Sequence, residues 1–282
     1  MEQVADQNQY PEKPRNFDAD QARDMFTPPE DADLQWVLVP VTHTDHARRR
    51  RRMYMLAGAF LAVAAIFASW MYKRTVDPVR ALDEYDAGER SLKIARYQQA
   101  IVSFDRAIAL KSDFADAYAL RGRANMALIR AQAALPDFDK VVELRPLDPV
   151  AFLDRGSAHM SLDEYKEALA DFSRAIELDP KLARGYNLRG TALRAMGEPK
   201  KALEDFTKAV DLDPNMDNLF QRGATYQLLN DHEFAIADFS QVIRLDQNSA
   251  QGYYARSQSF KALGDLESAE RDHQQGRIND GR

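Results

Sequence analysis

The residue types that most often carry chemistry are scattered along this 282-residue sequence. The five histidines stand at positions 43, 46, 159, 232 and 273, too far apart for an HExxH or similar metal spacing. The chain has no cysteine, which excludes disulfides, thiolate zinc sites and a cysteine nucleophile. It also has no phosphate-binding glycine loop and no GxSxG nucleophile elbow. We therefore predict a protein that is not an enzyme, with no catalytic residue, no metal site and no cofactor.

Arginine and aspartate, in contrast, recur at a regular spacing. The arginines are Arg121, Arg155, Arg189, Arg222 and Arg256, and the aspartates are Asp137, Asp171, Asp205, Asp238 and Asp272. The unit before Arg121 has lost both residues together, with Ala87 and Ser103 in their places. Joint loss favours ion pairs within one unit over ion pairs between neighbouring units. We interpret the pairs as structural, each worth about 0.2–1 kcal/mol if exposed.

The arginines and aspartates belong to a longer repeat of about 34 residues. Its other marks are a small residue, an alanine twelve places later, and a ring four places after the alanine. The small residues are Gly88, Gly122, Gly156, Gly190, Gly223 and Ser257; the rings are Phe104, Phe138, Phe172, Phe206, Phe239 and His273. The spacings place each set on one face of a helix, and glycine against alanine lets two helices approach closely. Prolines Pro146, Pro180 and Pro214 end the second helix of their units.

This pattern resembles the tetratricopeptide repeat, a helix–turn–helix unit. The resemblance implies an all-α, right-handed superhelical solenoid of about six helix pairs over residues 81–282. The predicted repeats are about 81–114, 115–148, 149–182, 183–215, 216–249 and 250–282. Three departures stand out: Pro136 lies within a second helix and is tolerable only if that helix starts late, the fifth repeat is one residue short, and the sixth ends in His273 as a terminal cap would.

By the same resemblance, the first helices line a concave groove that binds a protein or peptide. The candidate groove residues are Tyr85, Arg123, Met126, Leu153, Met160, Arg184, Asn187, Arg194, Phe220 and Tyr254. Their mixed apolar and basic character suits an extended peptide with an acidic or carboxylate feature. The carboxylate clamp of chaperone-binding relatives needs a lysine and an asparagine that the first two repeats lack, so we do not expect binding to cytosolic chaperone tails.

The segment before the repeats predicts a membrane anchor. Residues 53–72 are uncharged and long enough to span a bilayer as a helix. An arginine cluster, residues 48–52, precedes this segment, and residues 73–80 read as a linker. A cleavable signal peptide is the alternative, but its apolar part would be shorter and closer to the start of the chain. Residues 1–47 are acidic, contain several prolines and predict a disordered tail.

Charge gives an expected topology and excludes one class of partner. The more basic flank of a span stays cytoplasmic, which predicts a cytoplasmic tail and periplasmic repeats in a bacterial inner membrane. The net charge is −7 over residues 1–47, +7 over 48–82 and −6 over 83–282. A mildly acidic repeat domain argues against nucleic acid as a partner.

These observations favour a single-pass membrane scaffold, adaptor or assembly factor that binds a partner protein. The alternatives are a non-catalytic regulatory or tethering subunit of a membrane enzyme complex, and a receptor with cytosol-facing repeats. A homo-oligomer is possible, but nothing in the sequence indicates one.

Overall fold

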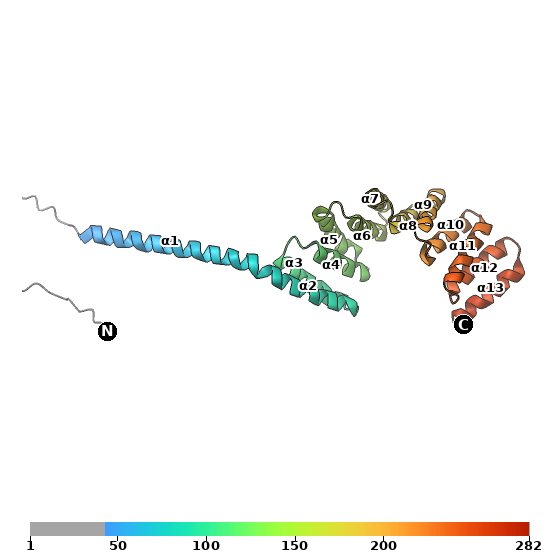
Figure 1. Ribbon diagram of the computed structural model, residues 1–282, viewed down its shortest axis with the longest axis horizontal. Helices are drawn as coiled ribbons and strands as arrows, with labels where there is room; N and C mark the ends of the chain where they lie inside the picture. The colour runs from blue at the N-terminus through green and yellow to red at the C-terminus, as the bar shows by residue number, and fades with distance from the viewer. Residues whose placement is uncertain (1–42, 282) are drawn as a thin grey trace, which may run out of the picture. The chain divides into compact units, whose positions relative to one another are not determined.

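A computed structural model describes residues 43–281, and over this range the chain is helical with no strand (Figure 1). Twelve of the helices form six consecutive pairs, and we call the first helix of each pair helix A and the second helix B. The pairs are α2 (Asp77–Lys93) with α3 (Tyr97–Leu110), α4 (Ala115–Ala127) with α5 (Ala131–Leu144), α6 (Pro149–Ser161) with α7 (Tyr165–Leu178), α8 (Ala183–Ala195) with α9 (Pro199–Leu212), α10 (Met216–Leu228) with α11 (His232–Leu245), and α12 (Ala250–Ala262) with α13 (Leu266–Asn279). The predicted all-α solenoid of six helix pairs is confirmed.

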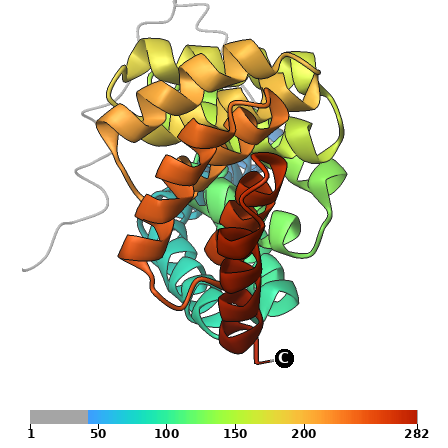
Figure 2. The ribbon, with the colours of Figure 1, turned by 90° about the vertical axis from the view of Figure 1, so that its right-hand side faces the viewer.

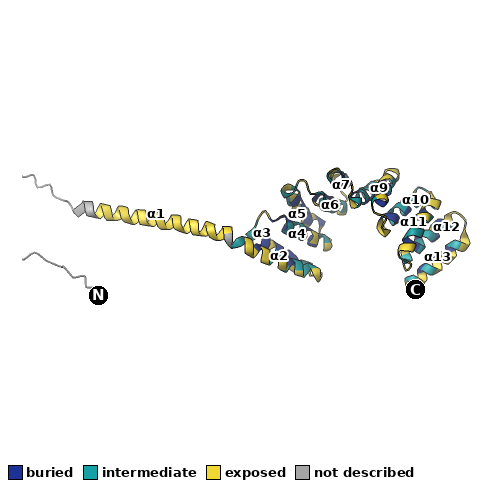
Figure 3. Cartoon of the chain, in the orientation of Figure 1, coloured by how far each residue is buried: buried dark blue, intermediate teal, exposed yellow. Residues whose placement is uncertain are grey.

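Helix α1 (His43–Thr75) precedes the pairs and is longer than the predicted apolar segment. It includes the arginine cluster and also residues 43–47, where the sequence predicts a disordered tail; the rest of that tail lies outside the described residues. Its described side chains are exposed (Figure 3). Among the described helices it is the one long and apolar enough to cross a membrane, judged by length and composition.

The expected linker over residues 73–80 is helical except at Val76. The amide of Val76 donates to the carbonyl of Tyr72 at 2.8 Å, and the amide of Arg80 donates to the carbonyl of Val76 at 3.1 Å. Pro78 lies in the first turn of α2, where its missing N–H and fixed φ are tolerated. The proline therefore marks the start of a helix and does not produce an irregular linker.

A phenylalanine ring fills the space between the helices of each of the first five pairs. These rings are at most 1% exposed: Phe104, Phe138, Phe172, Phe206 and Phe239. The sequence predicts that the glycine on helix A contacts the alanine on helix B. In the structure, the atoms nearest to a Cβ added at the glycine belong to the phenylalanine ring. A Cβ added at Gly122, for example, would lie 2.7 Å from Cε1 of Phe138. Glycine is required there because the ring occupies the space that a side chain would need. Buried residues lie between the helices throughout the array (Figure 3).

The repeated arginines and aspartates form ion pairs within repeats, as predicted. Each arginine donates from Nε and Nη2 to the aspartate sixteen residues later. These aspartates are at most 6% exposed, so the free energy given above for exposed pairs does not apply to them. Four arginines also donate from Nη1 to helix B of the preceding repeat, at Asp105, Asp139, Ser173 and Ser240. The arginines therefore join neighbouring repeats as well as the two helices of one repeat.

The three departures from the repeat have local explanations. Helix α5 does not start late: it begins at Ala131 and includes Pro136, so the helix accepts one missing backbone hydrogen bond. The missing residue of the fifth repeat falls in the loop between α9 and α10, where Asn215 caps α10 by accepting from the amide of Asn218. In the sixth repeat Ser257 donates to the carbonyl of Ala269 at 2.7 Å, and the imidazole of His273 lies 5.4 Å from the ring of Tyr254.

Candidate functional site

The A helices form the inner wall of the array. Each of α2, α4, α6, α8 and α10 approaches the next A helix, whereas no two B helices of the described chain approach each other. In a curved stack, the elements on the inside lie closer together than those on the outside. Viewed from one end, the pairs follow a curve (Figure 2). The A-helix wall is therefore the concave side, as the sequence resemblance implied.

Polar side chains of the A-helix wall bridge consecutive A helices. Arg123 Nε donates to Asp154 Oδ2 at 2.8 Å, joining α4 to α6. Asn187 Nδ2 donates to Asn218 Oδ1 at 2.6 Å, joining α8 to α10. Gln227 Nε2 donates to Ser259 Oγ at 2.7 Å, joining α10 to α12. These hydrogen bonds satisfy polar groups that, from the sequence alone, seemed available to bind a partner.

Two of the predicted groove residues are buried and pack inside the array. Leu153 is 1% exposed and packs in the core around Phe172. Asn187 is 7% exposed, and its amide also donates to Asp217 Oδ2 at 3.1 Å. We therefore correct their roles from partner contacts to packing and helix bridging.

The other predicted groove residues are half-buried or exposed. Tyr85 stacks on Phe114 with ring centroids 4.9 Å apart. Arg123 and Arg184 are exposed. The remaining half-buried residues contact the core or a neighbouring ring: Met126, Met160, Arg194, Phe220 and Tyr254.

The structure brings two pairs of predicted residues together in hollows beside the A helices. A hollow of about 390 Å³ is lined by Arg184 and Asn187. A second hollow, of about 320 Å³, is lined by Phe220 and Tyr254. The first also contains Asp213, Asn215, Asp217 and Asn218, and the second contains Gln227, Gln251 and Gln258.

Arg194 has a different environment from the other half-buried arginines. Its guanidinium carbon lies 5.2 Å from the ring centroid of Phe206. It donates to the carbonyl of Gln221 and to the hydroxyl of Thr225 at 3.4 and 3.3 Å, and to the side-chain oxygen of Gln221. Among the residues that the structure describes, no carboxylate lies within ion-pair distance of it. Burial lowers the pKa of Arg194, and Asp217 opposes this only through space.

Family models of the tetratricopeptide repeat match residues 85–149, 149–182, 183–216 and 217–249, more than half of the chain. The chain is a tetratricopeptide-repeat (TPR) protein. The curated proteins contain no match. Among solved structures, MamA 41-end from Desulfovibrio magneticus RS-1 is 26% identical, with a TM-score of 0.55, and covers 60% of this chain and 97% of its own. PilF of Pseudomonas aeruginosa is 16% identical with a TM-score of 0.63, covering 72% and 92%. YrrB, described as a TPR protein with an unusual peptide-binding site, is 22% identical with a TM-score of 0.51, covering 62% and 91%.

Reasoning from the sequence missed several residues of the TPR wall. Asp213, Asp217 and Asn218 line the same hollow as Arg184, and Gln221 and Thr225 hold Arg194. They were missed because Asp217, Asn218, Gln221 and Thr225 belong to the following repeat, while Asp213 lies in the loop that ends the repeat of Arg184. The signal available was the loop of residues 213–215, which is one residue shorter than its counterparts and is followed by polar residues at the start of α10.

The tyrosine at the start of the TPR wall has a perturbed pKa. Burial, together with the neighbouring carboxylate of Glu89, raises the pKa of Tyr85 to about 12. Its hydroxyl donates to Glu89 Oε1 at 3.3 Å. The phenol is therefore a neutral hydrogen-bond donor, held by an acidic neighbour.

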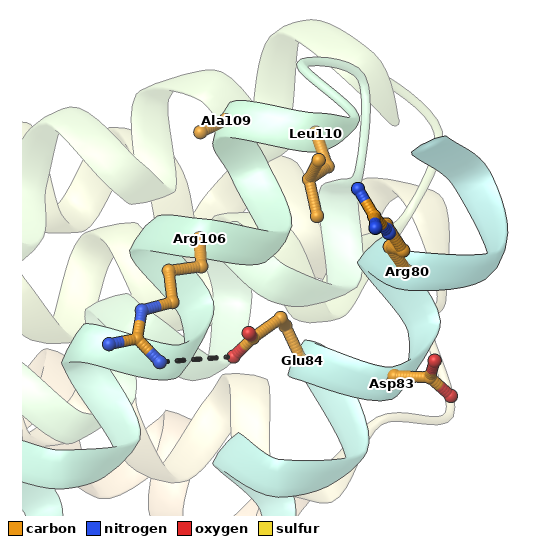
Figure 4. A pocket seen from close by; sticks show the side chains of 6 residues that line it. All are labelled: Arg80, Asp83, Glu84, Arg106, Ala109 and Leu110. Carbon is orange, nitrogen blue, oxygen red and sulfur yellow. Dashed lines mark ion pairs between the residues drawn. The ribbon is translucent and has the colours of Figure 1, made fainter. Parts of the chain in front are cut away.

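A further hollow of about 460 Å³ lies between α2 and α3 (Figure 4). Arg106 Nη1 lies 3.7 Å from Glu84 Oε2 within it. None of the predicted groove residues lines this hollow; its lining is Arg80, Asp83, Glu84, Arg106, Ala109 and Leu110.

Proposed function

We propose that this TPR protein is a membrane-anchored scaffold that binds an extended segment of a partner protein on its A-helix wall. The segment presents a carboxylate to Arg194. The supporting observation is the environment of that guanidinium, which is half-buried, lies over Phe206 and donates to neutral oxygens.

A carboxylate ligand would supply the counter-charge that the guanidinium of Arg194 lacks. Desolvation without a counter-charge is unfavourable for a guanidinium, which stays protonated in proteins. Each repeated arginine, from Arg121 to Arg256, has a buried aspartate partner, but Arg194 has neutral acceptors. A carboxylate would add charge-assisted hydrogen bonds in the planar geometry that arginine favours. YrrB, which has the same fold, is described as having a peptide-binding site, so the scaffold is compatible with this use.

Membrane anchorage through residues 53–72 is part of the same proposal. The supporting facts are the length and apolar composition of α1 and the exposure of its side chains. The basic cluster before this segment favours a cytoplasmic N-terminus, with the repeats in the periplasm of a bacterium.

The proposal is tested by crosslinking and affinity capture from membranes with a tagged full-length chain. A second chain lacks residues 81–282. We expect a defined partner to be captured by the full chain and lost with the repeats. Equal capture by both chains would show that the repeats do not bind it.

A further inference from the structure

The turn between helices A and B contains one residue with positive φ in every repeat. The φ angles range from 55° to 83°, at Ala95, Ile129, Asp163, Gly197, Asn230 and Gly264. Glycine, asparagine and aspartate tolerate this left-handed conformation, whereas a β-branched residue there is strained. Ile129, with φ 58°, is the β-branched member of the series.

The next residue in the turn is the N-cap of helix B, and it is also unfavourable in the second repeat. Repeats three to six have an acidic residue there: Glu164, Glu198, Asp231 and Asp265. Acidic side chains suit the positive end of a helix, and basic ones oppose it. The first two repeats have Arg96 and Arg130 at this place, and the second repeat combines its basic N-cap with the strained β-branched residue before it. Such places are where function is expected to override local stability.

Both residues of this turn face solvent. Ile129 is 94% exposed, and Arg130 is exposed, donating to the neutral Gln98 Oε1 at 2.9 Å. A hollow of about 340 Å³ adjoins them, lined by Met126 and Leu162 among others. Together these residues, with Ile129 and Arg130, form what we call the turn surface.

The charges beside the turn surface favour an acidic partner. The turn of the first repeat adds the exposed Arg96, together with Ile94, which is 61% exposed. On the other side, Asp163 accepts from the hydroxyl of Tyr165, and Glu164 lies 2.7 Å from the ring nitrogen of His159. All four charged groups are exposed, but Asp163 and Glu164 have partners beside them, whereas Arg96 and Arg130 form no ion pair within the described residues.

We propose that the turn surface binds an acidic protein segment that inserts an apolar side chain beside Ile129. The hollow suits one inserted side chain, and the arginines suit flanking carboxylates. A protein segment is favoured over an anionic bilayer because the surface combines one hollow, suited to a single apolar side chain, with arginines that suit the carboxylates beside it. The surface does not include Arg194, although Met126 on α4 belongs both to the turn surface and to the A-helix wall.

The first test places a photo-crosslinking amino acid at position 129 of the full-length chain in cells. The matched control has the same amino acid at position 163, the equivalent turn residue of the next repeat. We expect an adduct at 129 several-fold stronger than at 163, and mass spectrometry should place it on a protein segment with apolar residues among aspartates and glutamates. Equal adducts, or adducts only to lipid, to a second copy or to residues 1–42 of the chain itself, would overturn the proposal.

The second test uses that segment as a synthetic peptide, with Ile129→Gly and Arg130→Glu as variants of the full chain. Both changes restore a locally favourable residue, so both should raise the melting temperature while weakening peptide binding several-fold. Loss of binding with a gain of stability cannot be unfolding. Arg194→Gln should leave this binding unchanged, which separates the turn surface from the proposed groove. Wild-type binding by both turn variants would refute the inference.

Discussion

Arg222 holds the carboxylate of Asp238 through two hydrogen bonds, from Nε to Oδ2 at 2.9 Å and from Nη2 to Oδ1 at 2.7 Å. Asp238 is 2% exposed, so the pair lies inside the array. The same pairing recurs in four other repeats. Each of these repeats therefore has a buried ion pair beside its phenylalanine core.

Removing one partner of this ion pair should lower the free energy of unfolding. Asp238→Ala leaves a guanidinium largely desolvated, and we expect a loss of about 3–5 kcal/mol in the free energy of unfolding. Arg222→Met combined with Asp238→Leu removes both charges and should lie close to the wild type. Urea unfolding of all three chains measures this. A cost below about 1 kcal/mol for Asp238→Ala would mean that the pair behaves as an exposed one.

The space above the repeat glycine gives a second prediction. Gly122→Ala places a Cβ 2.7 Å from Cε1 of Phe138, so overpacking should destabilise the protein by about 1–3 kcal/mol. Gly58→Ala, where an added Cβ meets nothing within 4 Å, is the control for glycine replacement in a helix. Thermal unfolding should show the loss only at position 122. Equal effects at both positions would assign the cost to the backbone and not to the ring.

The phenol of Tyr85 makes stability depend on alkaline pH. Its pKa is raised from 10.0 to about 12, so folding favours the neutral phenol. The resulting stabilisation is complete below pH 10 and is lost as the pH rises towards 12. Tyr85→Phe should lose less stability over this interval than the wild type, in urea unfolding at matched pH values. Identical pH profiles for the two chains would contradict the assigned shift.

Topology is tested by protease treatment of spheroplasts that contain the chain with a different tag at each end. The arginine cluster before residues 53–72 should keep the N-terminal tag inside. We expect the C-terminal tag to be degraded and the N-terminal tag to survive. The reverse pattern would place the repeats in the cytosol.

The fold could be predicted because its determinants recur at one spacing. Gly122 and Phe138, and Arg222 and Asp238, each meet within one repeat, so a single unit contains the information. The same regularity explains why the A-helix wall was correctly identified.

The individual groove residues could not be predicted to the same degree, because their environments depend on the next repeat. Asn187 is buried by Asn218, and Arg194 is held by Gln221, one repeat further along. Leu153 is a core residue because its turn of α6 packs against Phe172, although its place in the repeat suggested the groove. The strain at Ile129 was also missed, because nothing in the sequence marks a single turn position as left-handed except the glycines of later repeats.

The central claim is that Arg194 binds a carboxylate of the partner, and it is tested by quantitative capture of that partner from crosslinked membranes. Arg194→Gln removes the charge, while Gln227→Ala removes an equivalent bridge between A helices without removing a charge. Both chains should keep the helical content of the wild type. We predict that Arg194→Gln lowers capture about tenfold or more, as expected for a lost charged hydrogen bond. Capture by Arg194→Gln equal to that of Gln227→Ala would contradict the claim.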